Sequence, residues 1–223
     1  MVCEELQPLC IYNPFFLFNI CNDTPDRAGV SVKLKELFPN CFIISTSNMG
    51  KDIGGKLALI QFLMESEIET EFLLFLHDKK SLQALKSSKW KNDLLHILTS
   101  ESIKAVINIF EKDEKCGIIA AKKYIINETI EDGQLINVNG KILEKLLKEY
   151  NLKMISYPFV AGTMFWARAK PFKDFFMKHN PLEIRRQLES GNVVDNFEGT
   201  ITHSWERILS WIVIGDGYDI KGI

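Results

Sequence analysis

A run of five apolar residues, 72–76, ends directly in the polar sequence HDKKS at residues 77–81. A continuous apolar run of this length, bounded by charge, predicts a strand that is buried on both faces, as strands are in open α/β sheets. Ligands of such sheets bind at the carboxyl ends of the strands. We therefore expect Asp78 to lie at a ligand site, although charged residues also end buried strands that bind nothing.

The side chains that follow this strand are a carboxylate, two ammonium groups and a hydroxyl, at Asp78, Lys79, Lys80 and Ser81. A carboxylate can hold a divalent cation, while lysines offset the charge of phosphate groups. The segment is therefore suited to a metal ion and a phosphorylated ligand. A solvated exit from the strand is the alternative, and the segment alone favours neither.

Alternation of apolar runs and helix-like periodicity predicts an α/β fold. At 223 residues and 46% hydrophobic content, the chain can form one compact domain over residues 1–223, which could be part of a longer protein. The predicted strands are 9–12, 41–44, 72–76 and 117–120, and the predicted helices include 30–38, 56–64, 103–110, 142–150, 171–177 and 204–214.

Charge and cysteine usage exclude several classes of protein. A net charge of −2 argues against nonspecific binding of nucleic acid through a basic face. The five cysteines are widely spaced and form no CxxC pair, so neither a disulfide scaffold nor a zinc site is indicated. No apolar run approaches the roughly 20 residues of a transmembrane helix. We expect a cytoplasmic protein with small-molecule partners.

The sequence GKDIGGK at residues 50–56 satisfies the first seven positions of a phosphate-binding loop. The eighth position must carry a hydroxyl for magnesium, and here it is Leu57. A nucleoside triphosphate-binding protein is therefore an alternative with one defect. Backbone N–H groups of such a turn can still approach a pyrophosphate or ribose, with Lys51 and Asp52 as the specific contacts. Equally, the glycines could serve only a turn and a helix cap.

The segment 202–207 begins an amphipathic helix in which His203 and Glu206 are three residues apart. This spacing places the two side chains on one helix face, where they could form a metal-binding or acid/base pair. Thr202 or Ser204 could instead cap the helix, with Glu206 favouring the positive end of the helix dipole.

Blocks that resemble one family follow each other along the chain at 48–55 (NMGKDIGG), 76–81 (LHDKKS), 159–166 (FVAGTMFW) and 203–207 (HSWER). Together they resemble the rhamnan synthesis F family of glycosyltransferases. The chain is also similar to the N-terminal glycosyltransferase domain of multidomain glycan-building proteins of large algal viruses. The resemblance implies a GT-A-like fold with a mostly parallel central sheet flanked by helices, a nucleotide-sugar donor and a divalent cation.

The resemblance also implies roles for individual residues. Asp78, with its neighbour His77, would stand in for the Asp-x-Asp motif of related folds and bind Mn²⁺ or Mg²⁺ at the diphosphate. Family members often carry Thr or Ser at the position of Asp78, so this metal role depends on the present sequence more than on the family. His203 would be a second metal ligand, and Glu206 the base that acts on the acceptor hydroxyl.

The remaining candidate residues would bind the nucleotide-sugar. The base and ribose would be bound by Tyr12, Asn13, Lys51 and Asp52. The phosphates would be bound by Lys79 and Lys80, and the donor sugar by Gly162, Thr163 and Trp166. The hypothesis is a metal-dependent transferase that moves a hexose or deoxyhexose, such as rhamnose, from a UDP or dTDP donor to a hydroxyl of a growing glycan. Its location would be the cytoplasm, the cytosolic face of a membrane or a virus-infected cell. A nucleoside triphosphate-binding protein and a noncatalytic glycan-binding module are the alternatives.

Overall fold

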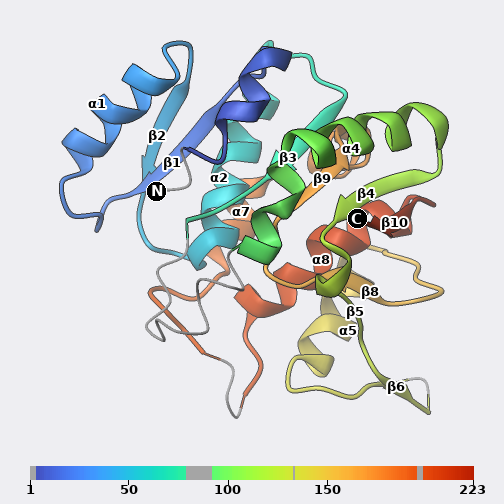
Figure 1. Ribbon diagram of the computed structural model, residues 1–223. Helices are drawn as coiled ribbons and strands as arrows, with labels where there is room; N and C mark the ends of the chain where they lie inside the picture. Colours follow the sequence, from blue (N-terminus) through green and yellow to red (C-terminus); the bar gives the residue numbers. More distant parts are fainter. Residues whose placement is uncertain (1–3, 79–91, 133, 195–197) are drawn as a thin grey trace.

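The computed structural model describes residues 4–78, 92–132, 134–194 and 198–223 and has an α/β fold (Figure 1). Its elements are η1 (Gln7–Tyr12), β1 (Leu17–Cys21), α1 (Arg27–Leu37), β2 (Phe42–Thr46), α2 (Lys51–Glu65), β3 (Phe72–Phe75), η2 (His96–Leu98), α4 (Ser100–Lys112), β4 (Cys116–Ala120), η3 (Lys122–Tyr124), β5 (Ile125–Asn127), β6 (Ile130–Glu131), β7 (Gln134–Leu135), α5 (Gly140–Glu149), β8 (Pro158–Val160), β9 (Phe165–Arg168), α6 (Ala169–Phe176), α7 (Pro181–Arg186), α8 (Ile201–Gly215) and β10 (Asp219–Gly222). The predicted α/β class is confirmed.

The described strands form a four-stranded sheet in the order β10-β4-β9-β3 and separate pairs, of which β1-β2 is parallel. In the four-stranded sheet β10 and β4 are parallel, but β9 runs antiparallel to both β3 and β4. The sheet is therefore mixed, and the mostly parallel central sheet of the prediction is not what the structure shows. Apolar periodicity reports which residues are buried, and it carries no information about strand direction.

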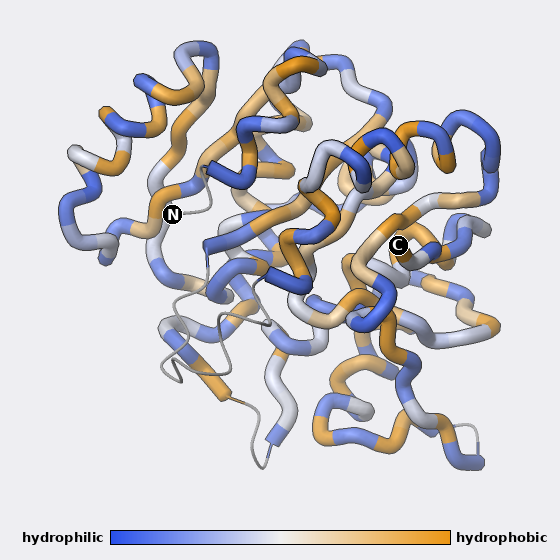
Figure 2. Tube along the Cα trace, in the orientation of Figure 1, coloured by the Kyte–Doolittle hydropathy of each residue, from blue (hydrophilic) through white to orange (hydrophobic). Residues whose placement is uncertain are grey.

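Helices cover both faces of the four-stranded sheet, as predicted. Neighbouring residues of β4 point to opposite faces, so Ile118 packs in the cluster that contains α8, while Ile119 packs against α4. The indole side chains of Trp205 and Trp211 on α8 are almost fully buried. Figure 2 shows hydrophobic residues along the central strands, whereas the turn at 113–115 between α4 and β4 is hydrophilic.

The strand predicted at 9–12 is wrong, because residues Gln7–Tyr12 form the 3₁₀ helix η1. Pro8 lies in its first turn, where a fixed φ and a missing N–H favour a helical start. The first strand is instead β1, at Leu17–Cys21. Consequently Tyr12 and Asn13 precede the amino end of β1, whereas ligands bind at carboxyl ends.

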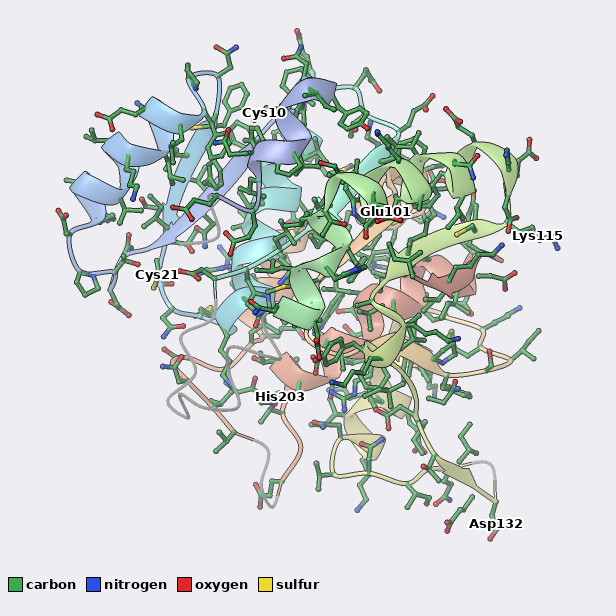
Figure 3. All side chains as sticks on the ribbon, in the orientation of Figure 1. Cys10, Cys21, Glu101, Lys115, Asp132 and His203 are labelled. Atoms are coloured by element: carbon green, nitrogen blue, oxygen red, sulfur yellow. The ribbon has the colours of Figure 1, made fainter. Side chains whose placement is uncertain are left out.

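Figure 3 makes the separation visible. Cys10 of η1 lies in the upper part of the molecule in this view, while Cys21, the last residue of β1, and His203 of α8 lie lower. The structure therefore does not bring Tyr12 and Asn13 to the edge where β1 and β2 end, and their predicted contact with base and ribose loses its basis. The position at the carboxyl end of the first strand, which the prediction had given to Tyr12 and Asn13, is occupied by residues 22 and 23.

Within the described ranges, no helix combines the length and the apolar character that crossing a membrane requires.

Candidate functional site

Segments that are distant in the sequence meet beyond the carboxyl end of β3. The antiparallel register pairs Phe75, the last residue of β3, with Phe165, the first residue of β9. The residues that follow β3 therefore lie next to the turn at 161–163 that precedes β9. The amino ends of α2 and α8 reach the same place, as the contacts of their side chains show.

Lys56 of α2 lies at the centre of this meeting point, and it is 3% exposed. Its Nζ donates to Asp52 Oδ2 at 2.9 Å and to Thr163 Oγ1 at 2.9 Å. The same Nζ lies 3.2 Å from His77 Nδ1. Thr163 Oγ1 in turn donates to Asp52 Oδ2 at 2.7 Å. Three of the predicted site residues, Asp52, His77 and Thr163, are thus brought together by a lysine that the prediction had assigned to another role.

The Asp52 carboxylate is held in its ionised form. Burial raises its pKa, but the adjacent Lys56 ammonium, the His77 ring and the Thr163 hydroxyl outweigh burial and lower the pKa below its usual range. Oδ2 of this carboxylate is therefore engaged by contacts within the protein. The predicted contact of Asp52 with the base and ribose of a ligand stays a prediction.

The glycines of the segment 50–56 serve the start and the packing of α2. Gly50 precedes the helix with a φ of 72°, which glycine adopts without strain. Gly54 lies inside α2, where an added Cβ would come within 1.7 Å of the Met49 carbonyl oxygen. The Lys56 ammonium group donates its hydrogen bonds within the protein, and the Leu57 side chain is fully buried. The lysine and the hydroxyl that a phosphate-binding loop needs are thus not supplied here, which removes the support for the nucleoside triphosphate-binding alternative.

Lys51 and His203 bring the amino ends of two 15-residue helices together. Lys51 is the first residue of α2, His203 lies in the first turn of α8, and Lys51 Nζ is 3.5 Å from His203 Nε2. The other ring nitrogen, His203 Nδ1, is 2.6 Å from Thr200 Oγ1, the N-cap of α8. Helix amino ends carry partial positive charge and attract anions. This corner of the site is therefore suited to a negatively charged ligand group.

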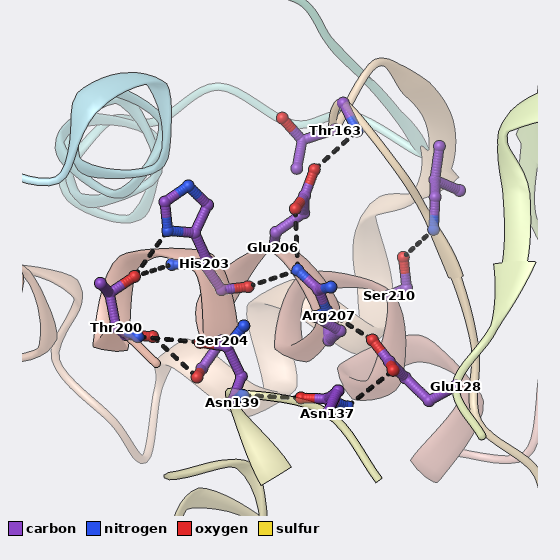
Figure 4. A network of polar contacts seen from close by, with 12 residues as sticks. Glu128, Asn137, Asn139, Thr163, Thr200, His203, Ser204, Glu206, Arg207 and Ser210 are labelled. Atoms are coloured by element: carbon purple, nitrogen blue, oxygen red, sulfur yellow. Dashed lines mark hydrogen bonds and ion pairs between the residues drawn. The ribbon is translucent and has the colours of Figure 1, made fainter. Parts of the chain in front are cut away.

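The Glu206 carboxylate is engaged on both oxygens (Figure 4). Oε1 accepts from the Gly162 N–H at 2.7 Å, and Oε2 accepts from Arg207 Nη1 at 2.9 Å. Arg207 Nε donates to Glu128 Oε1 at 2.7 Å, and the guanidinium lies over the Phe159 ring. Glu206 thereby anchors the turn at 161–163, in which Gly162 has a φ of 82°.

Glu189 caps the amino end of α8 from outside the helix. Its carboxylate accepts from the backbone N–H groups of Ile201 at 2.6 Å and Thr202 at 2.9 Å, and from the Thr202 hydroxyl at 2.6 Å. Burial raises the pKa of Glu189, but the Thr202 hydroxyl and the backbone N–H groups outweigh burial and lower it. This cap fixes the first turn of α8 and with it the position of His203.

The other predicted residues are placed as follows. Asp78 follows β3 and is exposed. Lys79 and Lys80 lie outside the described residues. Trp166 is on β9, where its Nε1 donates to the Ile97 carbonyl oxygen at 3.2 Å, so its side chain packs beneath η2. This packing role differs from the predicted contact with a sugar.

A metal site is not assembled by the described side chains alone. No three His, Cys, Asp or Glu side chains gather as a potential metal cluster within the residues that the structure describes. Cationic Lys51 and Lys56 are prominent here, and Asp52 is already paired. The described groups therefore fit an anion better than a resident cation, and the metal role of Asp78 and His203 stays a prediction.

Sequence reasoning missed several residues that shape the site, namely Lys56 as an internal contact, Arg207, Glu128 and Glu189. One signal was readable: Asp52 and Lys56 are four residues apart, the spacing of an ion pair on a helix. The contacts of Arg207 with Glu128 and of Glu189 with α8 depend on tertiary structure, and no local sequence pattern predicts them.

A family model described as rhamnan synthesis protein F matches residues 11–218. The chain belongs to the rhamnan synthesis protein F family. Comparisons with curated proteins and with solved structures gave no match. The predicted family is thus confirmed, and the match includes all four sequence blocks on which the resemblance depended. Membership of the rhamnan synthesis protein F family supports a role in glycan synthesis.

Proposed function

We propose that this member of the rhamnan synthesis protein F family is a glycosyltransferase with a nucleotide-sugar donor and a GT-A-like arrangement of its site. It transfers a hexose or deoxyhexose, with rhamnose as the sugar that the family description favours, from a UDP or dTDP donor to a glycan hydroxyl. The observation that carries the proposal is the contact of Lys51 with His203 at two helix amino ends. An acidic side chain, Asp78, is exposed at the end of β3 in the same region.

The diphosphate of the donor is assigned to Lys51 and the amino end of α2, beside His203, because the first N–H groups of α8 already donate to Glu189 and Thr200. Phosphate oxygens only accept hydrogen bonds, and helix amino ends and ammonium groups supply donors and positive charge. Lys56 does not take part directly, because its N–H donors are used inside the protein. Lys79 and Lys80 remain predicted contributors from outside the described residues.

The nucleoside is assigned to the carboxyl ends of β1 and β2. These parallel strands end at Cys21 and Thr46, and the Asn22 N–H donates to the Thr46 carbonyl oxygen at 2.7 Å. Ligands of parallel sheets bind in this position. Residues 22–23 and 47–48 therefore replace Tyr12 and Asn13 in the proposal.

The reacting sugar is assigned to the space between Asp78 and the turn at 161–163. Gly162 allows backbone to approach a ligand closely, and Glu206 holds that turn in place. Asp78 is the exposed carboxylate that can face the acceptor or a divalent cation. Mn²⁺ or Mg²⁺, if bound, would offset charge on the diphosphate leaving group.

A thermal-shift panel tests the proposal. UDP-sugars and dTDP-sugars, each with and without Mn²⁺, are expected to raise the melting temperature, because a ligand that binds only the folded state stabilises it. ATP and GTP are expected to give smaller shifts. Asp78→Ala should remove most of the Mn²⁺-dependent part of the shift. Stabilisation by ATP alone would overturn the proposal, and stabilisation by free sugars without any nucleotide effect would indicate a glycan-binding module.

A further inference from the structure

One residue, Glu189, contacts the amino ends of both α2 and α8. Its carboxylate accepts from the N–H groups of Ile201 and Thr202 at 2.6 and 2.9 Å, and from the Thr202 hydroxyl at 2.6 Å. Its backbone carbonyl oxygen accepts from the N–H of Gly50, the residue that precedes α2, at 2.8 Å. Glu189 therefore links the two helices through different groups, the side chain to α8 and the main chain to α2.

The segment 188–191, which we call the brace, pairs with residues 48–50 through the backbone. Met49 and Ser190 form an isolated antiparallel bridge. Two N–H···O bonds between the segments, at 2.8 and 2.7 Å, flank this bridge. The link from Glu189 to the start of α2 is therefore one of a set of backbone contacts.

The Leu188 side chain adds an apolar contact to this pairing. Leu188 is buried, and a Cβ added to Gly50 would come within 2.2 Å of Leu188 Cδ1. The brace and the start of α2 therefore lie in close contact through side chain as well as backbone. A displacement of the brace would displace the start of α2 with it, because close-packed groups cannot move independently.

The residues that Glu189 holds are the sequence neighbours of the proposed diphosphate site. Lys51 directly follows Gly50 in the sequence, and its Nζ lies 3.5 Å from His203 Nε2. His203 directly follows Thr202. The distance between these two side chains is thus set by a residue that contacts the neighbours of both.

We propose that Glu189 is a positioning residue, which joins the amino ends of α2 and α8 at the separation that lets Lys51, beside His203, bind the diphosphate of the nucleotide-sugar. Its role in ligand binding rests on the proposed function, whereas the joining of the two helices does not. The Glu189 carboxylate does not bind the diphosphate itself, since both of its oxygens accept from α8 and a diphosphate supplies no positive charge.

The sign of a change in nucleotide affinity tests this role. Glu189→Ala removes the carboxylate but keeps the backbone link to Gly50, so the two helices are no longer joined. By calorimetric titration at a temperature where the variant is folded, we expect UDP and dTDP to bind roughly 10-fold more weakly, as for loss of one charge-assisted contact. Glu183→Gln, at an exposed carboxylate of α7, is the matched control and should bind as the native protein does.

Two other results are possible, and both would overturn the proposal. A carboxylate that served only stability would leave the affinity of the folded protein unchanged when removed. A carboxylate that competed with the ligand for the N–H groups of α8 would give tighter binding when removed. Should the alanine variant not fold, Glu189→Gln keeps an acceptor oxygen for α8 and should give a smaller loss in the same direction, with the same two results against the proposal.

A double-mutant cycle tests whether Glu189 acts through Lys51. We expect Glu189→Ala combined with Lys51→Gln to weaken UDP binding about 10-fold, as each single variant does, because coupled residues do not contribute additively. Independent effects would instead multiply to roughly 100-fold. Such additive losses would overturn the proposal.

Amide hydrogen exchange without ligand tests the joining of the helices apart from the proposed function. The N–H groups of Gly50 and Gly191 form the bonds between the brace and residues 48–50. In Glu189→Ala they are expected to exchange faster, because the brace loses its attachment to α8. Unchanged exchange would overturn the joining role. Failure of the native protein to bind any nucleotide would refute the proposed function and with it the binding role of Glu189, while faster exchange would still support the joining of the helices.

Discussion

Glu206 shows how the contacts of one residue redefine its role. From sequence it was the candidate base, because a carboxylate in the first turn of a helix near a histidine suits proton transfer. In the structure its two oxygens accept from the Gly162 N–H and from Arg207. A base in this position would first have to release one of these contacts.

We therefore expect Glu206→Gln to reduce sugar transfer by less than about 10-fold, because the amide oxygen can still accept from the Gly162 N–H. Loss of a true general base would reduce the rate roughly 10²–10⁴-fold. Turnover under saturating donor and acceptor is the measurement, with Glu101→Gln on the exposed face of α4 as a matched control. A loss of 10³-fold or more in a folded variant would restore the base assignment.

At this scale the sequence predicted which candidate residues lie close together better than it predicted the contacts that each one makes. The contacts join Asp52, His77 and Thr163 in one cluster, Lys51 and His203 in another, and Gly162 with Glu206, and all were candidates. Lys56 and Arg207 engage Asp52 and Glu206 from nearby positions in the sequence, whereas the contacts of Lys56 with His77 and Thr163 and of Arg207 with Glu128 form only in three dimensions.

Among the elements, α8 contributes most to the position of the site. It packs against β8, β4, α2, α5 and α6, and its first two turns carry His203 and Glu206. Glu189, in the segment after α7, supplies the carboxylate that caps the first turn. Because the pKa of Glu189 is lowered in the folded protein, its contribution to stability is present above the unfolded pKa, about 4.3, and is lost as pH falls through the folded pKa.

Glu189→Gln is expected to lower the free energy of unfolding at pH 7 by about 1 kcal/mol, through loss of charge at a helix amino end. The difference from the native protein should shrink as pH falls below about 4.3, because the native carboxylate becomes protonated there too. Urea unfolding at pH 7 and at several values below pH 5 measures it. The same difference at all pH values would show that the charge of Glu189 does not stabilise α8.

The apolar pattern of the sequence predicted helices and strands correctly where it was continuous, as at α8, β3 and β4. The first strand was misplaced, because the apolar residues of 9–12 compete with those of 17–21 and only the Pro8 turn decides between them. The direction of β9 depends on its neighbours in the sheet, so the mixed topology could not be derived from periodicity.

In the whole molecule, the proposed site lies at one edge of the α/β fold. The ends of β1, β2 and β3 and the amino ends of α2 and α8 bring together residues from 22 to 206 of a chain whose family match extends over 11–218. A site built from so many segments forms only when the entire domain is folded. Ligand binding and global stability should therefore be coupled.

The most direct test is calorimetric titration of UDP and dTDP into the native protein, Lys51→Gln and Lys145→Gln. Lys51 contacts His203 at the proposed diphosphate site, whereas Lys145 is an exposed residue of α5. We expect the native protein to bind, Lys51→Gln to bind about 10-fold more weakly through loss of one charge-assisted contact, and Lys145→Gln to bind as the native protein does. Equal affinities for the native protein and Lys51→Gln, or binding of neither nucleotide, would contradict the proposed diphosphate site.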